Sequence, residues 1–283
     1  MAIVADSTAS LPAGVVAGLP LYIVPFEVHH AGRVYFDGVD IEPASFYEIQ
    51  AQGGATPTTS APQPASFLDA FCRAAEHASD IVCLTLAASL SAANASAELA
   101  QAEAMTALPG VGITLVDSRT AGVAEGLVAL EAARLAKAGA DRAQTLATID
   151  KRISDVWFVG SLETLYYVWK GGRVPRVAMW LGNLLGVKPI LELGAGRIGM
   201  LERPRTNARA LDRLVALVAK RLDGKPGRVA VAHAAAPERA DELARRLSAE
   251  INLVELFVTE FTPVIGAHTG PGLVGCAVHP VEP

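Results

Sequence analysis

The chain has 283 residues, of which 51% are hydrophobic and 6% aromatic, and its formal net charge at pH 7 is -5. This length provides for roughly two domains, each with a core of its own. The acidic balance, without a long run of lysine and arginine, excludes the basic footprint of a nucleic-acid-binding protein, so we expect no nucleic-acid partner.

The cysteines argue against a disulfide framework and a zinc site. Cys72, Cys83 and Cys276 are far apart and form no Cys-x-x-Cys pair, and the histidines show no metal-ligand spacing, so we expect no metal ion. The start of the sequence lacks the basic and apolar regions of a signal peptide, and no segment approaches about 18 uninterrupted apolar residues. We therefore expect a cytoplasmic protein with at most transient membrane contact.

Short apolar runs alternate with longer segments of helical periodicity along the chain. The predicted strands are 2–5, 22–28, 33–36, 81–86, 112–116, 156–160, 188–193, 197–201, 228–232, 253–259 and 273–278. The predicted helices are 44–52, 64–77, 92–106, 121–138, 143–153, 162–169, 175–185, 208–222 and 238–248. Repeated strand-helix order in the first half predicts a parallel sheet covered by helices.

The second half mixes a hairpin with strand-helix units, which predicts a separate sheet of mixed strand direction. The fold class is therefore α/β with two domains. Residues 1–153 are expected to form an N-terminal parallel-sheet α/β domain, and residues 154–283 a C-terminal α+β domain with a mixed sheet.

Polar turns follow three predicted strands of the first half. They are 6–8 (Asp-Ser-Thr), 89–91 (Ser-Leu-Ser) and 117–118 (Asp-Ser). Because ligands of parallel α/β sheets gather at the carboxyl ends of strands, we expect these turns to converge on one edge of the sheet. A further hydroxyl-rich segment, Thr58-Thr59-Ser60, is predicted to be a proline-flanked loop.

The glycines at 194, 196 and 199 match the spacing of a dinucleotide-binding motif but not its context. That motif requires a helix to open at once so that its N-terminus meets the pyrophosphate. Pro204 forbids such a helix here, and a tight β-hairpin explains the glycines better. A Gly-x-Ser-x-Gly nucleophile elbow is also missing from the sequence, although a Ser91–His268 pair stays open.

Lys170-Gly171-Gly172-Arg173 follows an aromatic segment and resembles a helix C-terminus, with a left-handed glycine and basic residues that complement the dipole. The apolar residues 177–181 come next, and they fit either a core or the lining of an apolar cavity. A basic rim beside an apolar wall would suit an amphipathic anion.

Residues 266–272 (Gly-Ala-His-Thr-Gly-Pro-Gly) are predicted to form a loop between two apolar runs. Its glycines let the backbone approach a ligand closely, and His268 is a hydrogen-bonding group whose charge can change near neutral pH. A glycine-rich turn with a solvated histidine explains the same residues, so the loop alone does not distinguish a ligand-binding site from an ordinary turn.

Taken in order, eight segments of the chain resemble the DegV family of bacterial fatty-acid-binding proteins. They are residues 4–12, 35–38, 57–62, 89–91, 116–118, 170–173, 188–190 and 266–272. The resemblance spans essentially the whole chain. It implies a two-domain protein that buries a long-chain fatty acid in a tunnel and presents the carboxylate to a separate dihydroxyacetone-kinase-like fatty acid kinase, which makes an acyl phosphate.

The resemblance also implies which residues hold the fatty-acid carboxylate: Thr59, Ser60, Ser91 and His268. Arg173 falls in the family's basic loop and is expected to serve kinase docking or gating of the head group. The family usually has Gly-Thr where this chain has Ala92-Ala93, and Gln where Ala61 stands. These departures affect the head-group geometry rather than the overall pattern.

We therefore expect a lipid carrier that is not itself a catalyst and needs no cofactor. The alternative is a Ser/His-dependent enzyme that uses the same cleft on a small acyl or phosphoryl substrate, with His268 as acid or base. A third reading is a lipid sensor that works without a kinase.

Overall fold

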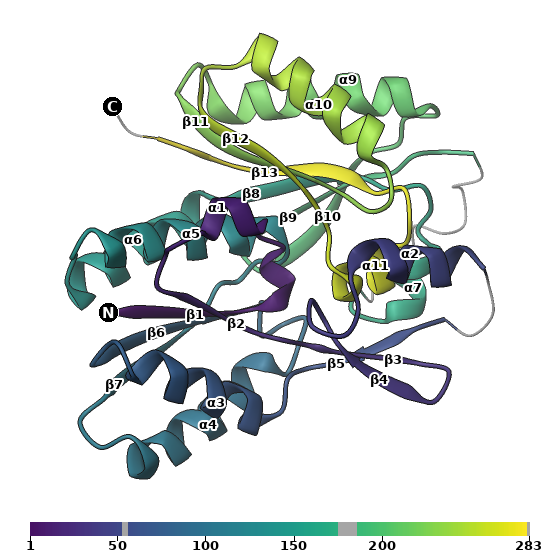
Figure 1. Ribbon diagram of the computed structural model, residues 1–283. Coiled ribbons are helices and arrows are strands. Elements are labelled where there is room, and N and C mark those ends of the chain that lie inside the picture. The colour runs from purple at the N-terminus through teal and green to yellow at the C-terminus, as the bar shows by residue number, and fades with distance from the viewer. Residues whose placement is uncertain (53–55, 175–185, 282–283) are drawn as a thin grey trace.

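The computed structural model describes residues 1–52, 56–174 and 186–281. The predicted helix 175–185 lies outside the described residues. Figure 1 shows two main sheets stacked with helices between and around them, and a small third sheet at one side.

The N-terminal sheet is parallel, as the strand-helix alternation predicts. Its order is β2 (Leu21–Val24), β1 (Ala2–Asp6), β6 (Asp80–Thr85), β7 (Gly112–Asp117). Helices α3 (Pro64–Ala75) and α4 (Ala93–Ala107) pack on one face of it. The short η1 (Ser7–Ala9) and α1 (Ala13–Val16) follow β1.

The C-terminal sheet is mixed, which confirms the predicted fold class. Its order is β10 (Arg197–Glu202), β9 (Ile190–Gly194), β8 (Trp157–Ser161), β13 (Val274–Pro280), β11 (Gly227–His233), β12 (Leu253–Glu260). Only β11 and β12 pair in parallel, and the other neighbours are antiparallel. Helices α9 (Asn207–Leu222) and α10 (Pro237–Glu250) cover its outer face.

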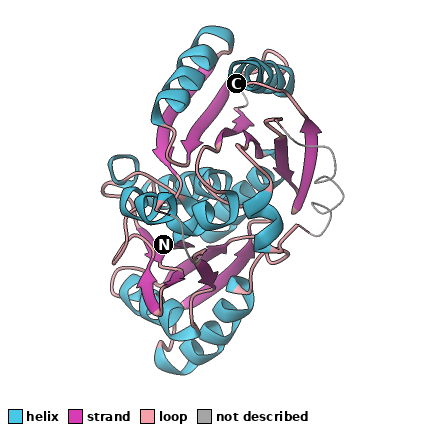
Figure 2. Ribbon diagram, turned by 90° about the vertical axis from the view of Figure 1, so that its right-hand side faces the viewer, coloured by secondary structure: helices cyan, strands magenta, loops and turns pink. Residues whose placement is uncertain are grey.

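Helix α5 (Val123–Lys137) lies between the two sheets and contacts β1 on one side and β11 and β13 on the other. Figure 2 shows this helical layer in the middle of the molecule. Ten of its residues are buried, which suits a helix covered on both sides. The predicted domain boundary after residue 153 falls near the end of α6 (Arg142–Asp155) and stays a prediction.

The predicted strand 22–28 is wrong, because Pro25 divides it. Proline lacks an N–H and fixes φ, so β2 ends at Val24 and the chain enters a separate antiparallel sheet. That sheet has the order β4 (Arg33–Phe36), β3 (Glu27–His30), β5 (Thr58–Ser60), and α2 (Pro43–Ala51) precedes β5. The predicted loop at residues 58–60 is therefore the strand β5.

The predicted loop at residues 266–272 is also wrong in its first half, because α11 spans Pro263–Thr269. Proline at the first helical turn favours the start of a helix, and Gly270 ends it with a φ of 75°. Gly266 lies inside the helix because Tyr47 of α2 packs there: a Cβ on Gly266 would lie 2.6 Å from the tyrosine Oη. The glycine thus serves helix packing.

The hairpin prediction for residues 194–199 is confirmed. Gly194 pairs with Arg197, and the two residues between them, Ala195 and Gly196, have φ values of 49° and 74°. These values are typical of a type I′ turn, whose twist matches that of antiparallel strands. The helix predicted at 162–169 is shifted toward the C-terminus: α7 spans Tyr166–Gly171 and ends at Gly172 with a φ of 70°.

Candidate functional site

A cavity of about 420 Å³ lies between the polar edge of the N-terminal sheet and the inner face of the C-terminal sheet. Most of its lining is apolar. Lining residues include Leu86, Leu90, Phe158, Phe261, Val264 and Leu273. The volume falls within the range of roughly 300–1,000 Å³ that is typical of small-molecule sites.

The polar turns after β1, β6 and β7 meet at one edge of the sheet, as expected. The Leu86 N–H donates to Asp6 Oδ2 at 2.7 Å, and the Ala88 N–H donates to Asp117 Oδ1 at 3.2 Å. Side chains at the carboxyl ends of the two strands that flank β6 thus hold the turn after β6, which carries Leu90 and Ser91 into the cavity wall.

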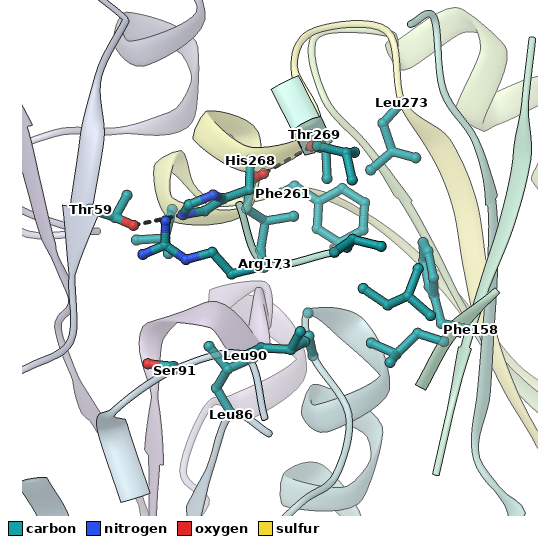
Figure 3. Close-up of a pocket in the computed structure, with 18 of the residues that line it drawn as sticks. Thr59, Leu86, Leu90, Ser91, Phe158, Arg173, Phe261, His268, Thr269 and Leu273 are labelled. Atoms are coloured by element: carbon teal, nitrogen blue, oxygen red, sulfur yellow. Dashed lines mark hydrogen bonds between the residues drawn. The ribbon is translucent and has the colours of Figure 1, made fainter. Parts of the chain in front are cut away.

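All five residues singled out from the sequence line this cavity, although they come from four separate segments. They are Thr59 and Ser60 on β5, Ser91 before α4, Arg173 after α7, and His268 on α11. In Figure 3, Thr59, His268, Arg173 and Ser91 lie toward one end, whereas Phe158 and Leu273 lie toward the other. The cavity therefore has a polar end and an apolar end.

Thr59 and His268 form the central contact of the polar end, with 2.7 Å between Thr59 Oγ1 and His268 Nε2. Burial, helped by the positive charge of Arg173, lowers the pKa of His268 to about 4. The imidazole is therefore neutral near pH 7. Its Nδ1 is buried and has no hydrogen-bond partner among the described residues. Gly171 leaves room for the ring, because a Cβ there would lie 2.6 Å from Nδ1.

The two candidate serines differ in where their hydroxyl protons go. Ser60 Oγ donates to Glu27 Oε2 at 2.9 Å and lies 2.8 Å from His29 Nε2, so its hydroxyl is engaged outside the cavity. Ser91 Oγ instead accepts the Ala93 N–H at 3.2 Å, as a side chain at a helix N-terminus does. That acceptance leaves the Ser91 proton free to donate to a ligand.

Arg173 supplies the positive charge of the polar end. It is exposed, and its Nη1 donates to the Gly171 carbonyl at 2.6 Å. Figure 3 shows its guanidinium beside Thr59 and His268. Among the described residues no carboxylate pairs with it. The polar end thus offers hydroxyl donors and the positive charge of Arg173.

Two residues that shape the polar end were missed in the sequence. Glu27, which is buried, binds the hydroxyl of Ser60, and Gly171 makes room for the His268 ring. Alternation along a strand could have placed Glu27 and His29 on one face, but the sequence gives no sign of what that face contacts. The sequence predicts Gly171 at a helix C-terminus, which is correct for its backbone. That prediction does not include its contact with the His268 imidazole.

A second polar cluster, the buried carboxyl network, consists of Asp6, Thr8 and Glu125, and it is linked to the cavity wall by the hydrogen bond from the Leu86 N–H to Asp6. Thr8 Oγ1 lies 2.6 Å from Asp6 Oδ1 and 2.8 Å from Glu125 Oε2. A hydroxyl has one proton to donate, so one of these carboxyls must be protonated. Burial raises the pKa of Asp6 to about 6 and that of Glu125 well above its usual value, and the charge of Asp6 raises the pKa of Glu125 further, whereas the hydrogen-bonded interaction with Glu125 lowers that of Asp6. Glu125 is therefore the neutral acid.

Asp37 follows β4 of the small sheet and reaches the turn after β1 through Ser7. It accepts a 2.6 Å hydrogen bond from Ser7 Oγ, which in turn accepts the Phe26 N–H at 3.1 Å. Burial raises the pKa of Asp37 to about 7. Leu86, held by Asp6, and Phe26, held through Ser7, both line the cavity, so these acids support its wall without facing its interior.

The described residues contain no group of three or more His, Cys, Asp or Glu side chains placed to hold a metal ion. None of the helices in the described ranges is long and apolar enough to span a bilayer.

Comparison with known proteins gives consistent matches over the whole chain. The family model for uncharacterised proteins of the DegV family matches residues 1–281. A DegV domain-containing protein of Streptomyces coelicolor is 39% identical, with 98% of each chain covered. A DegV family protein from Thermus thermophilus, whose structure was solved for its fatty acid binding, is 30% identical with a TM-score of 0.91 and 99% of each chain covered. A stearic-acid-binding protein from Eubacterium ventriosum is 25% identical with a TM-score of 0.90, and 99% of this chain and 98% of that one are covered.

Proposed function

The chain belongs to the DegV family, and from this premise we propose that it binds a long-chain fatty acid in the cavity and presents its carboxylate to a separate kinase. The observation that carries the proposal is the division of one cavity into an apolar end and a polar end rich in donors. A fatty acid has the same division along its length. The fatty acids bound by the relatives from Thermus thermophilus and Eubacterium ventriosum support this ligand class.

In this proposal the tail supplies most of the affinity. Each CH₂ that leaves water contributes about 0.8 kcal/mol before the costs of ordering the chain. The apolar wall formed by Leu86, Phe158, Phe261 and Leu273 receives it. Orientation then falls to the polar end, because an apolar wall cannot distinguish one end of a chain from the other.

The carboxylate would bind Thr59 and Ser91, with Arg173 supplying opposite charge. If His268 carries its proton on Nε2, it donates to Thr59 Oγ1 across 2.7 Å, and the Thr59 proton is left for the ligand. Each charge-assisted hydrogen bond of this kind contributes about 1.5–3 kcal/mol. Ser60 is the weakest member of the predicted set, because its proton already binds Glu27.

Presentation to a kinase is the finer part of the proposal. Arg173 is exposed and lies at the polar end, where it could contact a partner that reaches for the carboxylate. The partner expected from the family resemblance is a dihydroxyacetone-kinase-like fatty acid kinase in the cytoplasm, and the chain itself would perform no chemistry.

The Ser/His-dependent enzyme is less well supported by the geometry. A histidine acting as base is commonly oriented by a hydrogen bond to its second nitrogen, whereas His268 Nδ1 has no such partner among the described residues. The contact of His268 Nε2 is with Thr59, and Ser91 is bonded to the backbone of Ala93.

A comparison of two ligands tests the binding proposal. Delipidated protein is titrated with a long-chain fatty acid and with the fatty alcohol of equal length, which keeps the tail and lacks the charge. We expect the acid to bind at least ~10-fold more tightly, and Thr59→Val to remove most of that difference. Thr269→Val is the matched control, because the Thr269 hydroxyl lines the same cavity but donates to the Ile265 carbonyl. Equal affinity for acid and alcohol would refute the carboxylate site.

A further inference from the structure

The apolar end of the cavity rests on a patch of sheet without side chains. Gly160 of β8 pairs directly with Gly275 of β13, so two adjacent strands leave bare backbone at this point. Phe158 lies two residues before Gly160 on the same face of β8, and its ring covers the patch. The neighbouring residues Trp157 and Val159 point to the opposite face, into the core beneath α9 and α10.

The contacts show how closely the ring lies on this patch. A Cβ on Gly160 or on Gly275 would lie 2.9 Å from Phe158 Cζ, and a Cβ on Gly160 would also lie 3.0 Å from Leu273 Cδ1. Both Phe158 and Leu273 line the cavity. Side chains at these two glycines would therefore push the cavity wall inward.

The ring is also fixed from the side. Phe261 meets Phe158 edge-to-face, with 6.0 Å between ring centroids, and Phe261 itself fits only because Gly122 is small: a Cβ there would lie 2.9 Å from Phe261 Cε1. Edge-to-face pairs of this kind are attractive beyond their buried area. The Phe158 ring can lie close against the sheet because Gly160 and Gly275 have no side chains, and its position limits the depth of the apolar end of the cavity.

We propose that the Phe158 ring, lying on the Gly160–Gly275 pair, sets the length of acyl chain that this protein accepts. The inference rests on the proposed fatty-acid function and adds to it the residues that select among fatty acids. In Figure 3, Phe158 lies across the cavity from Thr59, where the end of a tail anchored at Thr59 and Ser91 would arrive.

Two substitutions should move the preferred length in opposite directions. Gly160→Ala raises the Phe158 ring and Leu273 into the cavity, so the tightest ligand becomes shorter. Phe158→Ala removes the ring and deepens the cavity, so the tightest ligand becomes longer. Each CH₂ that loses or gains its place changes Kd by about 4-fold. Gly275→Ala is unsuitable, because its Cβ would lie 2.5 Å from the backbone oxygen of Val159.

The experiment titrates each delipidated variant with a homologous series of saturated fatty acids and records the length of the tightest binder. Gly194→Ala is the matched control for the glycine, since its Cβ would meet only Trp157, at 3.4 Å and away from the cavity. Val159→Ala is the control for lost core volume, because Val159 is fully buried on the opposite face of β8. Neither control should change the preferred length.

The outcomes separate this inference from the function on which it rests. Opposite shifts in the two variants, with unmoved controls, would establish the ring as the length gauge. A length preference in the unaltered protein that neither variant changes would overturn the inference and leave fatty-acid binding intact. If Gly160→Ala does not fold, Phe158→Ala decides alone: no shift to longer chains overturns the proposal. Failure of the unaltered protein to bind any member of the series would overturn the function itself.

Discussion

The polar end of the cavity and the buried carboxyl network lie at the same edge of the N-terminal sheet but carry opposite chemistry. Thr59 and Ser91 offer hydroxyl donors to the cavity beside the positive charge of Arg173, and His268 contacts the Thr59 hydroxyl. Asp6 and Glu125 are acids without any solvent exposure whose hydrogen bonds run to backbone and to each other through Thr8. The carboxyl of Asp6 thus holds the cavity wall at Leu86, whereas the polar end of the cavity is suited to bind a negatively charged ligand.

The largest effect is expected from Asp6→Ala. Removal of this carboxyl leaves the N–H groups of Leu86 and Thr8 and the Thr8 hydroxyl without their acceptor, at about 1–3 kcal/mol for each buried group. We expect the free energy of unfolding to fall by at least ~3 kcal/mol in urea denaturation. Asp6→Asn keeps one oxygen acceptor and should lose less. A loss below ~1 kcal/mol in the alanine variant would show that the network does not support the fold.

His268→Ala combined with Ser91→Ala should weaken lipid binding strongly and change the stability of the fold little. The pair removes Ser91, which is proposed to bind the carboxylate, and His268, which is proposed to orient the Thr59 hydroxyl toward it, so the Kd for a long-chain fatty acid should rise roughly 100-fold. Stability should change by no more than ~1.5 kcal/mol, chiefly through loss of the hydrogen bond from the Ala93 N–H to Ser91 Oγ. Lipid titration and urea denaturation of the same sample measure both quantities. Unchanged lipid affinity would refute the site assignment.

Asp37→Asn tests whether burial of an ionised Asp37 carboxylate destabilises the folded protein. Burial raises the pKa of Asp37 to about 7 in the folded protein from 3.8 for an unperturbed aspartate, so the folded state keeps its proton to higher pH. The stability gained from that proton is complete below about pH 4 and is lost as the pH rises through 7. We expect Asp37→Asn to be more stable than the parent by about 1–3 kcal/mol at pH 8 and equal to it at pH 4. Thermal unfolding across this range checks both, and a variant less stable at pH 8 would contradict the assignment.

The smallest effect on lipid binding is expected from Arg173→Ala. The side chain is exposed, so its attraction for the carboxylate is screened and its loss should weaken lipid binding by less than ~1 kcal/mol. Acyl-phosphate formation with a competent fatty acid kinase should fall more than lipid affinity does. Arg119→Ala is a suitable control, because Arg119 is exposed and lies outside the cavity lining. Full kinase coupling in the Arg173 variant would refute the docking role.

The sequence predicts the two main sheets well because their signals are local. Runs such as 81–86 and 228–232 carry their own strand periodicity, and Pro204 alone rules out a dinucleotide-binding helix after the glycines. The five candidate residues of the site came from motif resemblance, and the structure brings all of them to one cavity. Their proposed roles stay predictions.

The errors arise where partners distant in sequence decide the local structure. Gly266, which suggests a loop, lies inside α11 because Tyr47, more than two hundred residues earlier, packs against it. Likewise, nothing near Ser60 shows that its proton binds Glu27. The Gly160–Gly275 pair beneath Phe158 depends on the register of β8 with β13, and these strands lie more than one hundred residues apart in the sequence. Contacts between residues so far apart cannot be predicted from the local pattern of a single sequence.

Fatty-acid binding is tested most simply by mass spectrometry of an organic extract from the freshly purified, denatured protein. We expect one fatty acid per chain, with a tail long enough to reach Phe158 from the polar end of the cavity. An extract without fatty acid, together with no thermal stabilisation by added fatty acids of any length, would contradict this expectation and favour a small polar substrate in the same cleft.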